Sequence, residues 1–329
     1  MKKQKGAALL MAMLTVTLVA TLASAALWQQ WRQVEIETAE RGRSQTAWMM
    51  TGALDWTRLI LREDAISAQA AGVDHLGEPW ALPVQESKLS TFLSQDQQWR
   101  EGDAEVFLSG YITDAQSRLN ARNLVEDGQI APTELATWQR LFERLNLPMS
   151  ELQSLSQQLV LALTSSGTGS DASSAAGRAD NSSAKVALMP QRTAQLVWLG
   201  LSPTTLSALE NFITVLPEAT TVNLNTAPAE VLMACVPGLD LASARQLVGL
   251  RARAPWTSLD AARKAFGHAA RSVDDRRHSV RSNYFEVNGR MRIDQVVQQE
   301  RAIVKREGNQ VRMLWRARAP SLTSAPALQ

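Results

Sequence analysis

The chain has 329 residues, of which 45% are hydrophobic, and its 34 basic residues nearly balance its 32 acidic ones. This composition excludes a wholly disordered chain, and the length allows one or two domains with their own cores. The formal net charge of +2 gives no reason to expect general attraction to nucleic acid. Cys235 is the only cysteine, which excludes an intrachain disulfide, and its apolar neighbours predict a buried free thiol.

The first predicted element is an apolar segment that directly follows a basic leader. Residues 1–6, MKKQKG, precede 21 uncharged residues, 7–27, which as a helix would measure about 30 Å and cross a bilayer once. Because the lysines precede the span, the N-terminus is expected in the cytoplasm and the rest outside. Gly6 at this boundary indicates a prepilin-like leader, cut between Gly6 and Ala7, with methylation of the new Ala7 amine. The alternative is a Sec signal peptide, for which ASAA at 23–26 offers a cleavage site.

Residues 28–72 continue the helical period of the apolar span, so the predicted helix is apolar all round at first and amphipathic afterwards. Apolar side chains recur at i, i+4, i+7 and i+11, at Met49, Ala53, Trp56 and Ile60, flanked by Met50, Leu54 and Leu61. We expect a rod whose first half lies in lipid and whose second half packs on a globular head, with Gly72 ending the pattern. The glycine and prolines of DHLGEPWALP, residues 74–83, then predict a loop.

Alternating residues predict one strand early in the chain and three near its end. They are AEVFLSGYITD, RSNYFEV, GRMRIDQVVQQERAIVKRE and NQVRMLWRAR. About 160 residues of helical character separate the first strand from the others, so we expect an antiparallel sheet packed on the long helix, with a helical domain inserted into it. Asn288-Gly289 favours a two-residue hairpin turn, but a three-residue loop, Asn288 to Arg290, aligns the apolar faces better, and we favour the longer loop.

The predicted insertion contains a loop and a compact helical unit. Residues 164–186 are rich in Ser, Gly and Ala, which predicts a flexible loop. Asp171, Asp180 and Asn181 in this loop are weak metal-ligand candidates, since they lack the alternating spacing of a calcium loop.

The helical unit, residues 221–267, resembles helix-hairpin-helix, or SAM-like, modules. Its predicted N-caps are Thr226, Asp240 and Ser258. DNA-binding members of this class hold a phosphate on a Gly-hydrophobic-Gly turn. Here the turn reads PGLDL, so the second glycine is missing and Asp240 puts a negative charge at the phosphate position. We expect a packing module and no nucleic-acid partner; a membrane-anchored periplasmic DNA-binding protein is the alternative.

Six segments over nearly the full length together resemble the K-class minor pseudopilins of the type II secretion system, the GspK family. They are KGAALLM, DHLGEPWA, RLNARNL, NLNTAPAEVL, SNYFEV and VRMLWRAR. The resemblance implies a pilin-like head in the periplasm, anchored by one span in the inner membrane, at the tip of a pseudopilus. It implies a role in pseudopilus assembly and in export of folded proteins across the outer membrane. The implied partners are the I-class and J-class minor pseudopilins, other pseudopilins and prepilin peptidase, with the secretin or exoprotein cargo as further candidates.

Met11 stands where a prepilin normally has glutamate, at the fifth residue of the predicted mature chain. In pilin-like filaments that glutamate is thought to pair with the N-terminal ammonium of the subunit above, which neutralises two charges in lipid. Met11 cannot form this pair, and a subunit with nothing above it does not need to. The alternative is that Met11 is merely a tolerated lipid-facing residue.

No enzymatic chemistry is predicted. His75, His268 and His278 are the only histidines, and none belongs to a recognisable nucleophile or metal pattern. Calcium is implied by the family resemblance alone, and this sequence lacks the Asp-rich stretch that family members often carry near the long loop. We therefore expect neither catalysis nor a cofactor that the residues themselves specify.

The expected fold class is α+β: a long N-terminal transmembrane helix packed on an antiparallel pilin-like sheet, with a large inserted all-α domain. The expected division is leader 1–6, transmembrane segment 7–27, pilin-like helix and first strand 28–118, inserted domain 119–277, C-terminal strands 278–318 and tail 319–329.

Overall fold

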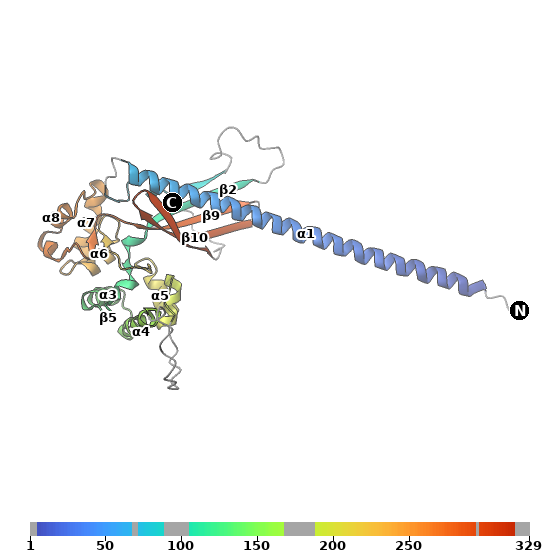
Figure 1. Cartoon of the computed structure of the whole chain (residues 1–329), viewed down its shortest axis with the longest axis horizontal. Helices are drawn as coiled ribbons and strands as arrows, with labels where there is room; N and C mark the ends of the chain where they lie inside the picture. Colours follow the sequence, from blue (N-terminus) through green and yellow to red (C-terminus); the bar gives the residue numbers. More distant parts are fainter. Residues whose placement is uncertain (1–4, 68–71, 89–104, 168–187, 294–295, 320–329) are drawn as a thin grey trace, which may run out of the picture.

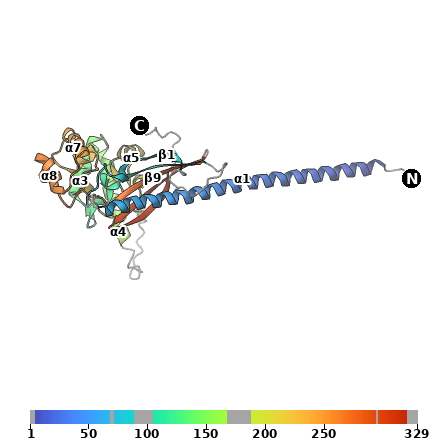
Figure 2. The ribbon, with the colours of Figure 1, turned by 90° about the horizontal axis from the view of Figure 1, so that it is seen from above.

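The structure is a rod that ends in a globular head. The computed structural model describes residues 5–67, 72–88, 105–167, 188–293 and 296–319. Helix α1 (Lys5–Ile66) has 62 residues, which corresponds to a length of about 93 Å. Its N-terminal part projects freely, and its C-terminal part lies along a sheet (Figures 1 and 2).

Helix α1 packs on the sheet only where its sequence becomes amphipathic. Thr46, Met50, Leu54 and Leu61 are buried, at spacings of four, four and seven residues, so they form one stripe. The centre of this stripe lies one residue beyond the predicted one, since Trp56 is 40% exposed. The helix ends at Ile66, which is earlier than the predicted end at Gly72.

The head contains a five-stranded antiparallel sheet in the order β1-β2-β9-β10-β11. The strands are β1 (Val84–Lys88), β2 (Val106–Asp114), β9 (Tyr284–Ile293), β10 (Val296–Glu307) and β11 (Gln310–Ala319). Strand β1 was not predicted. Its sequence, VQESK, lies at the sheet edge with all five residues partly or fully exposed, so it lacks the apolar alternation that reveals a half-buried strand.

The predicted turn at Asn288-Gly289 is wrong in both of its forms, because β9 runs through it without interruption. Gly289 pairs with Gly110 of β2 on one side and with Glu300 of β10 on the other. A Cβ on Gly289 would come within 3.1 Å of Met50 Sδ, and a Cβ on Gly110 within 2.7 Å of the Asn288 carbonyl oxygen. These glycines therefore permit close approach of the helix and of the neighbouring strand, rather than a turn.

The chain between β2 and β9 forms the inserted lobe, residues 115–283. Its helices are α3 (Pro132–Arg144), α4 (Met149–Gly167), α5 (Pro203–Leu209), α6 (Ala229–Cys235), α7 (Leu241–Arg253) and α8 (Leu259–Ala265). The lobe is not all-α as expected, since short strands pair β3 (Leu119–Asn120) with β6 (Ile213–Thr214), β4 (Val125–Glu126) with β5 (Gln129–Ile130) and β7 (Val222–Asn223) with β8 (His278–Ser279). The domain limits at 119 and 277 stay predictions.

The lobe has a hydrophobic core separate from that of the sheet. Large side chains meet in it, among them Trp138, Phe142, Leu155 and Leu232 from three helices and Trp256 from the connection between α7 and α8. Cys235 is part of this core and is 2% exposed, which confirms the predicted buried free thiol. Helices α7 and α8 lie beyond the C-terminal end of α1, at the end of the molecule opposite the N-terminus (Figures 1 and 2).

Candidate functional site

Asp114, the last residue of β2, fixes the point where the chain leaves the sheet for the lobe. Its buried carboxylate accepts hydrogen bonds from Gln116 N (2.7 Å), Asn223 Nδ2 (3.0 Å), Thr226 Oγ1 (2.5 Å) and Ser282 Oγ (2.5 Å). Burial raises the pKa of Asp114 to about 6, and the bonds from Ser282 and Thr226 oppose this rise. One carboxylate thus joins the sheet to both ends of the inserted lobe.

Asp74 extends this network to the loop that follows α1. Its carboxylate accepts from Ser282 N (2.7 Å) and from the guanidinium of Arg306, while its backbone carbonyl accepts from Asn223 Nδ2 (3.1 Å). Arg306, on β10, also donates to Asp64 Oδ2 (2.9 Å) at the end of α1. Burial raises the pKa of Asp64, and the Arg306 charge partly offsets this. We call the seven residues Asp64, Asp74, Asp114, Asn223, Thr226, Ser282 and Arg306 the junction network.

A further acid, Glu78, lies beside the junction network. Its carboxylate accepts from His75 N (3.0 Å) and Trp80 Nε1 (2.6 Å), and burial raises its pKa to about 7. Carboxylate oxygens of Asp64, Asp74 and Glu78 lie within 4.8 Å of one another. Two of these three acids are already bonded to Arg306, so the residues do not fit a calcium site, whose ligands would have to release the guanidinium first.

The raised pKa of Glu78 predicts a pH-dependent stability. An acid whose pKa rises on folding stabilises the folded state below its ordinary pKa of 4.5, and this contribution is lost as the pH rises through about 7. The measurement is urea unfolding of the detergent-purified chain. We expect Glu78 to make the free energy of unfolding about 1–2 kcal/mol lower at pH 8 than at pH 5. Glu78→Gln should flatten this difference, and Glu126→Gln, at an exposed position, should not. Equal slopes in both variants would contradict the assignment.

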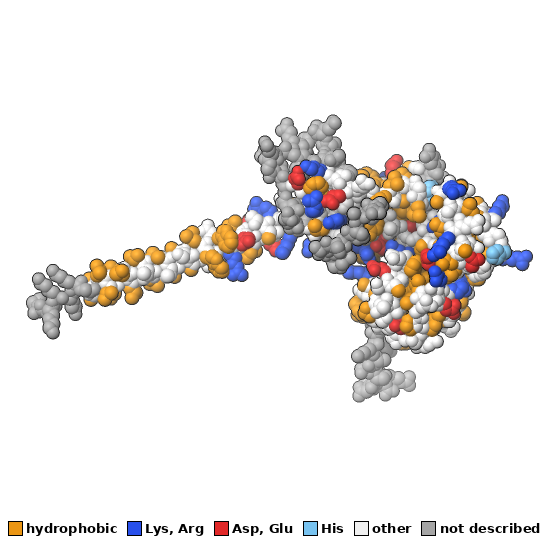
Figure 3. All heavy atoms as spheres, turned by 180° about the vertical axis from the view of Figure 1, so that it is seen from behind, with side chains coloured by type: hydrophobic (Ala, Val, Ile, Leu, Met, Phe, Trp, Pro, Cys, Tyr) orange, Lys and Arg blue, Asp and Glu red, His pale blue; other side chains and the backbone are white. Residues whose placement is uncertain are grey.

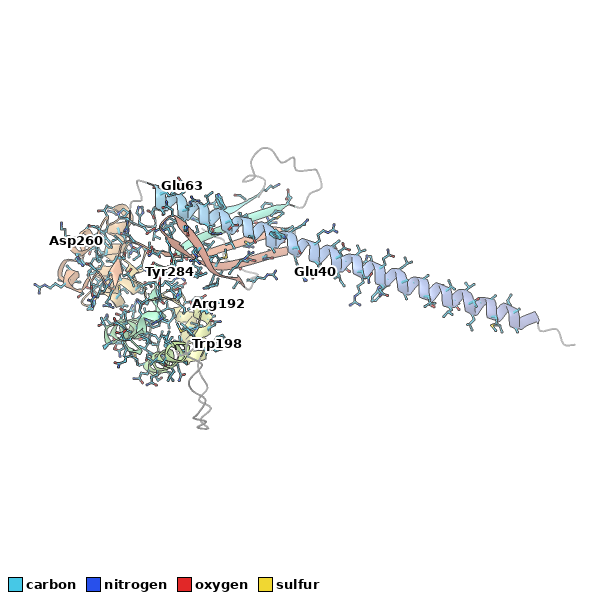
Figure 4. The ribbon with its side chains drawn as sticks, viewed as in Figure 1. Glu40, Glu63, Arg192, Trp198, Asp260 and Tyr284 are labelled. Atoms are coloured by element: carbon cyan, nitrogen blue, oxygen red, sulfur yellow. The ribbon has the colours of Figure 1, made fainter. Side chains whose placement is uncertain are left out.

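The sheet and the lobe are also joined on the other side of the junction network. Tyr284 of β9 donates to Glu218 Oε1 (2.5 Å) and lies where the sheet meets the lobe (Figure 4). Lys305 Nζ lies 2.9 Å from the same Glu218 oxygen. The Arg192 guanidinium lies 5.4 Å from the centre of the Trp315 ring on β11. These contacts, together with the junction network, hold the lobe in one orientation on the sheet.

Of the three predicted N-caps, two are confirmed and one is wrong. Asp240 accepts from Ser243 N (2.8 Å) at the start of α7, and Ser258 accepts from Ala261 N (3.1 Å) at the start of α8. Thr226 does not cap α6, whose N-cap position is Pro228, because its hydroxyl donates to Asp114 instead. The NLNTAP segment is thus a docking segment as well as a helix start, and its sequence carries no local signal for the docking role, because the partner Asp114 is more than a hundred positions away.

The predicted helix-hairpin-helix turn offers no free anion site. The carboxylate of Asp240 accepts from both the backbone N–H and the hydroxyl of Ser243. This carboxylate therefore occupies the N-terminal end of α7. These bonds hold the pKa of Asp240 below its usual value, so the group stays negatively charged where a phosphate would bind.

Two groups with potential chemical reactivity are packed inside the lobe. Burial raises the pKa of the Cys235 thiol to about 12 and lowers that of His278 to about 4. His278 Nε2 lies 3.3 Å from the Cys235 carbonyl oxygen, and its Nδ1 bonds the backbone of Asp274. The neutral thiol and neutral imidazole therefore serve packing and hydrogen bonding.

Comparisons with known proteins agree on one family. Two family models, both described as type II secretion system (T2SS), protein K, match residues 117–218 and 222–281. The chain is also 27% identical over 300 residues to the type II secretion system protein K of Pseudomonas aeruginosa, covering 86% of this chain and 83% of that protein. These matches support a K-class minor pseudopilin of the type II secretion system.

A solved structure supports the α+β fold. A chain of the crystal structure of the GspK-GspI-GspJ complex from enterotoxigenic Escherichia coli is similar with a TM-score of 0.60 and 16% identity, over 86% of this chain and 99% of that chain. This likeness shows the α+β fold, and the family models together with the P. aeruginosa relative support a minor pseudopilin role in type II secretion. Nothing in these matches supports the DNA-binding alternative.

The N-terminal residues singled out in the sequence lie far from the junction network. Ala7 and Met11 lie near the start of α1, and Met11 is 70% exposed. Met11 precedes Thr46, the first buried residue of α1, by about 50 Å along the helix axis. Cleavage after Gly6 and methylation of Ala7 stay predictions. The weak metal candidates Asp171, Asp180 and Asn181 lie outside the described residues.

Proposed function

We propose that this minor pseudopilin occupies the tip of a pseudopilus, assembled with an I-class and a J-class minor pseudopilin. The E. coli neighbour was solved in a complex with GspI and GspJ. The observation that carries the tip position is the placement of α7 and α8 beyond the C-terminal end of α1 (Figures 1 and 2). In a filament whose subunits stack along their long helices, the lobe would fill the space that a following subunit needs.

The same proposal gives the chain one membrane span, with the N-terminus in the cytoplasm and the head in the periplasm. Among the described residues, α1 is the one helix long and apolar enough to cross a membrane, and its apolar window has no contact with the head. Hydrophobic side chains cover the outer part of the rod, and charged side chains gather on α1 only nearer the head (Figure 3). The lysines before the span support this orientation by the positive-inside rule.

Processing at the leader tests the pilin-like assembly route. We expect prepilin peptidase to cut between Gly6 and Ala7 and the Ala7 amine to be methylated, because Gly6 stands at the boundary between the basic and apolar segments. Intact-mass measurement of membrane-extracted protein should show loss of residues 1–6 and addition of one methyl group, and Gly6→Val should retain the leader. A mature chain that begins near Ala25 to Leu27 would identify a Sec signal peptide instead.

Met11→Glu tests the tip position. With no subunit above, the new carboxyl group has no ammonium partner and costs about 2–3 kcal/mol in the bilayer unless it becomes protonated. Secretion of exoproteins and co-assembly with the other minor pseudopilins should fall or stay unchanged. Met13→Glu is the matched control, since Met13 is similarly exposed on the same segment. A clear gain for Met11→Glu that Met13→Glu does not give would show an internal subunit with a restored ion pair.

A further inference from the structure

The apolar part of α1 ends in two exposed tryptophans and an arginine. Trp28 and Trp31 are the first aromatic residues of the chain, and they are 62% and 63% exposed. The Arg32 guanidinium lies 5.7 Å from the centre of the Trp28 ring. Residues at i, i+3 and i+4 share one face of a helix. One side of α1 therefore presents two indoles and a cation, directly after the uncharged segment 7–27.

This combination of groups matches the headgroup layer of a bilayer. An indole has a large apolar ring and one polar N–H, so tryptophan is enriched where apolar chains meet water. An arginine at the same level can keep its stem on the apolar side while its guanidinium reaches lipid phosphates. Faces of membrane helices that bind other helices are instead enriched in small residues that let the backbones approach closely. The size of Trp28 and Trp31 therefore favours lipid over a partner helix.

The segment that follows, residues 33–45 of α1, has the exposed, charged character of a helix in water, and we call it the stalk. It has no fully buried residue, and ion pairs Arg41–Glu37 (3.0 Å) and Arg43–Glu40 (2.6 Å) stabilise it as a helix. The first buried residue of α1 is Thr46. The 14 residues from Arg32 to Thr46 correspond to about 21 Å of helix.

We propose that Trp28, Trp31 and Arg32 bind phospholipid headgroups of the outer leaflet and fix the depth of the anchor, so that the stalk holds the head about 20 Å above the bilayer. This rests on the proposed single membrane span. The anchor would set the height at which the head of the membrane-inserted subunit meets its partners before assembly.

Cysteine accessibility in vesicles tests the proposal. The full chain is reconstituted in vesicles of phosphatidylethanolamine and phosphatidylglycerol, with Leu27→Cys, Gln30→Cys or Val34→Cys introduced one at a time, and a membrane-impermeant maleimide is added. Cys235 stays in place, since its buried thiol should not react, and the parent chain serves as the check. We expect Val34→Cys to react at least about tenfold faster than Leu27→Cys, with Gln30→Cys in between.

The double variant Trp28→Ala/Trp31→Ala should change the labelling rate at Gln30→Cys by about threefold or more, because the depth is no longer fixed. Trp48→Ala is the matched control: Trp48 is 77% exposed on the same helix beyond the stalk, and its loss should leave all three rates unchanged. Unchanged rates in the double variant, or protection of Gln30→Cys only after addition of partner pseudopilins, would overturn the anchor. Failure of the chain to insert into vesicles would overturn the proposed membrane span. If the chain inserts but labelling does not change between residues 27 and 34, only the anchor would be overturned.

Discussion

Replacing Arg306 by methionine is expected to lower the free energy of unfolding by about 3–5 kcal/mol at pH 7.5, because it leaves buried carboxylates without their cation. Arg306 bonds Asp64 and Asp74 and also donates to the Ser282 carbonyl (2.8 Å). Its guanidinium lies 4.9 Å from the centre of the Phe285 ring, a contact that methionine largely keeps. The measurement is urea unfolding of the detergent-purified full chain.

The effect of Arg306→Met should be smaller at pH 5 than at pH 7.5. Burial already raises the pKa of Asp64, and without Arg306 this pKa rises further, so that stability is retained where the acid is protonated and lost as the pH rises through its folded-state pKa. Arg312→Met, at an exposed position on β11, should change stability by no more than about 0.5 kcal/mol. If both variants lose similar stability, or if the loss from Arg306→Met does not depend on pH, the ion pairs of Arg306 do not stabilise the junction network.

Asp114→Ala is expected to destabilise the chain by about 3–5 kcal/mol, because it leaves several buried donors without an acceptor. Asn223 keeps a bond to the Asp74 carbonyl, but the hydroxyls of Thr226 and Ser282 lose the carboxylate they share. Since these residues come from the lobe and from its return to the sheet, the lobe should also loosen from the sheet. Hydrogen exchange should then rise at Val222 and Leu224, whose amides donate to the carbonyl oxygens of Arg277 and Ser279.

The matched control is Asp114→Asn, which keeps the shape and part of the hydrogen bonding. The hydroxyls of Thr226 and Ser282 can turn to accept from the new amide, whereas the Asn223 amide would face another donor. We expect a loss of about 1–2 kcal/mol and little increase in exchange. An alanine variant as stable as the asparagine variant would mean that the carboxylate does not organise the junction.

Local sequence patterns predict the elements whose structure follows from their own residues. The apolar segment 7–27, the amphipathic half of α1, four of the five sheet strands and the insertion between the first of these strands and the other three follow from periodicity and composition. Asn288-Gly289 was misread because its turn preference is local, whereas the contact that decides it is with Met50, far away in the sequence. Strand β1 gave no signal because an edge strand need not bury one face.

The junction network could not be predicted, because it joins residues that are distant in the sequence. Asp114 meets Ser282 across 168 positions and Asn223 across 109. No periodicity links such residues, and apart from the nearby Gln116 amide the donors to the Asp114 carboxylate are brought to it only by the tertiary structure. Thr226 shows the consequence, since a residue with a good local explanation as a cap takes a long-range partner instead.

The tip position is tested most directly by labelling isolated pseudopili. An epitope tag inserted after Ala176, in the Ser/Gly-rich segment of the lobe, would be detected with gold-conjugated antibody in pseudopili that carry the I-class and J-class partners. The account predicts gold at one end of each filament only. Gold distributed along the filament length would show that the lobe does not exclude a following subunit, and it would contradict the tip position.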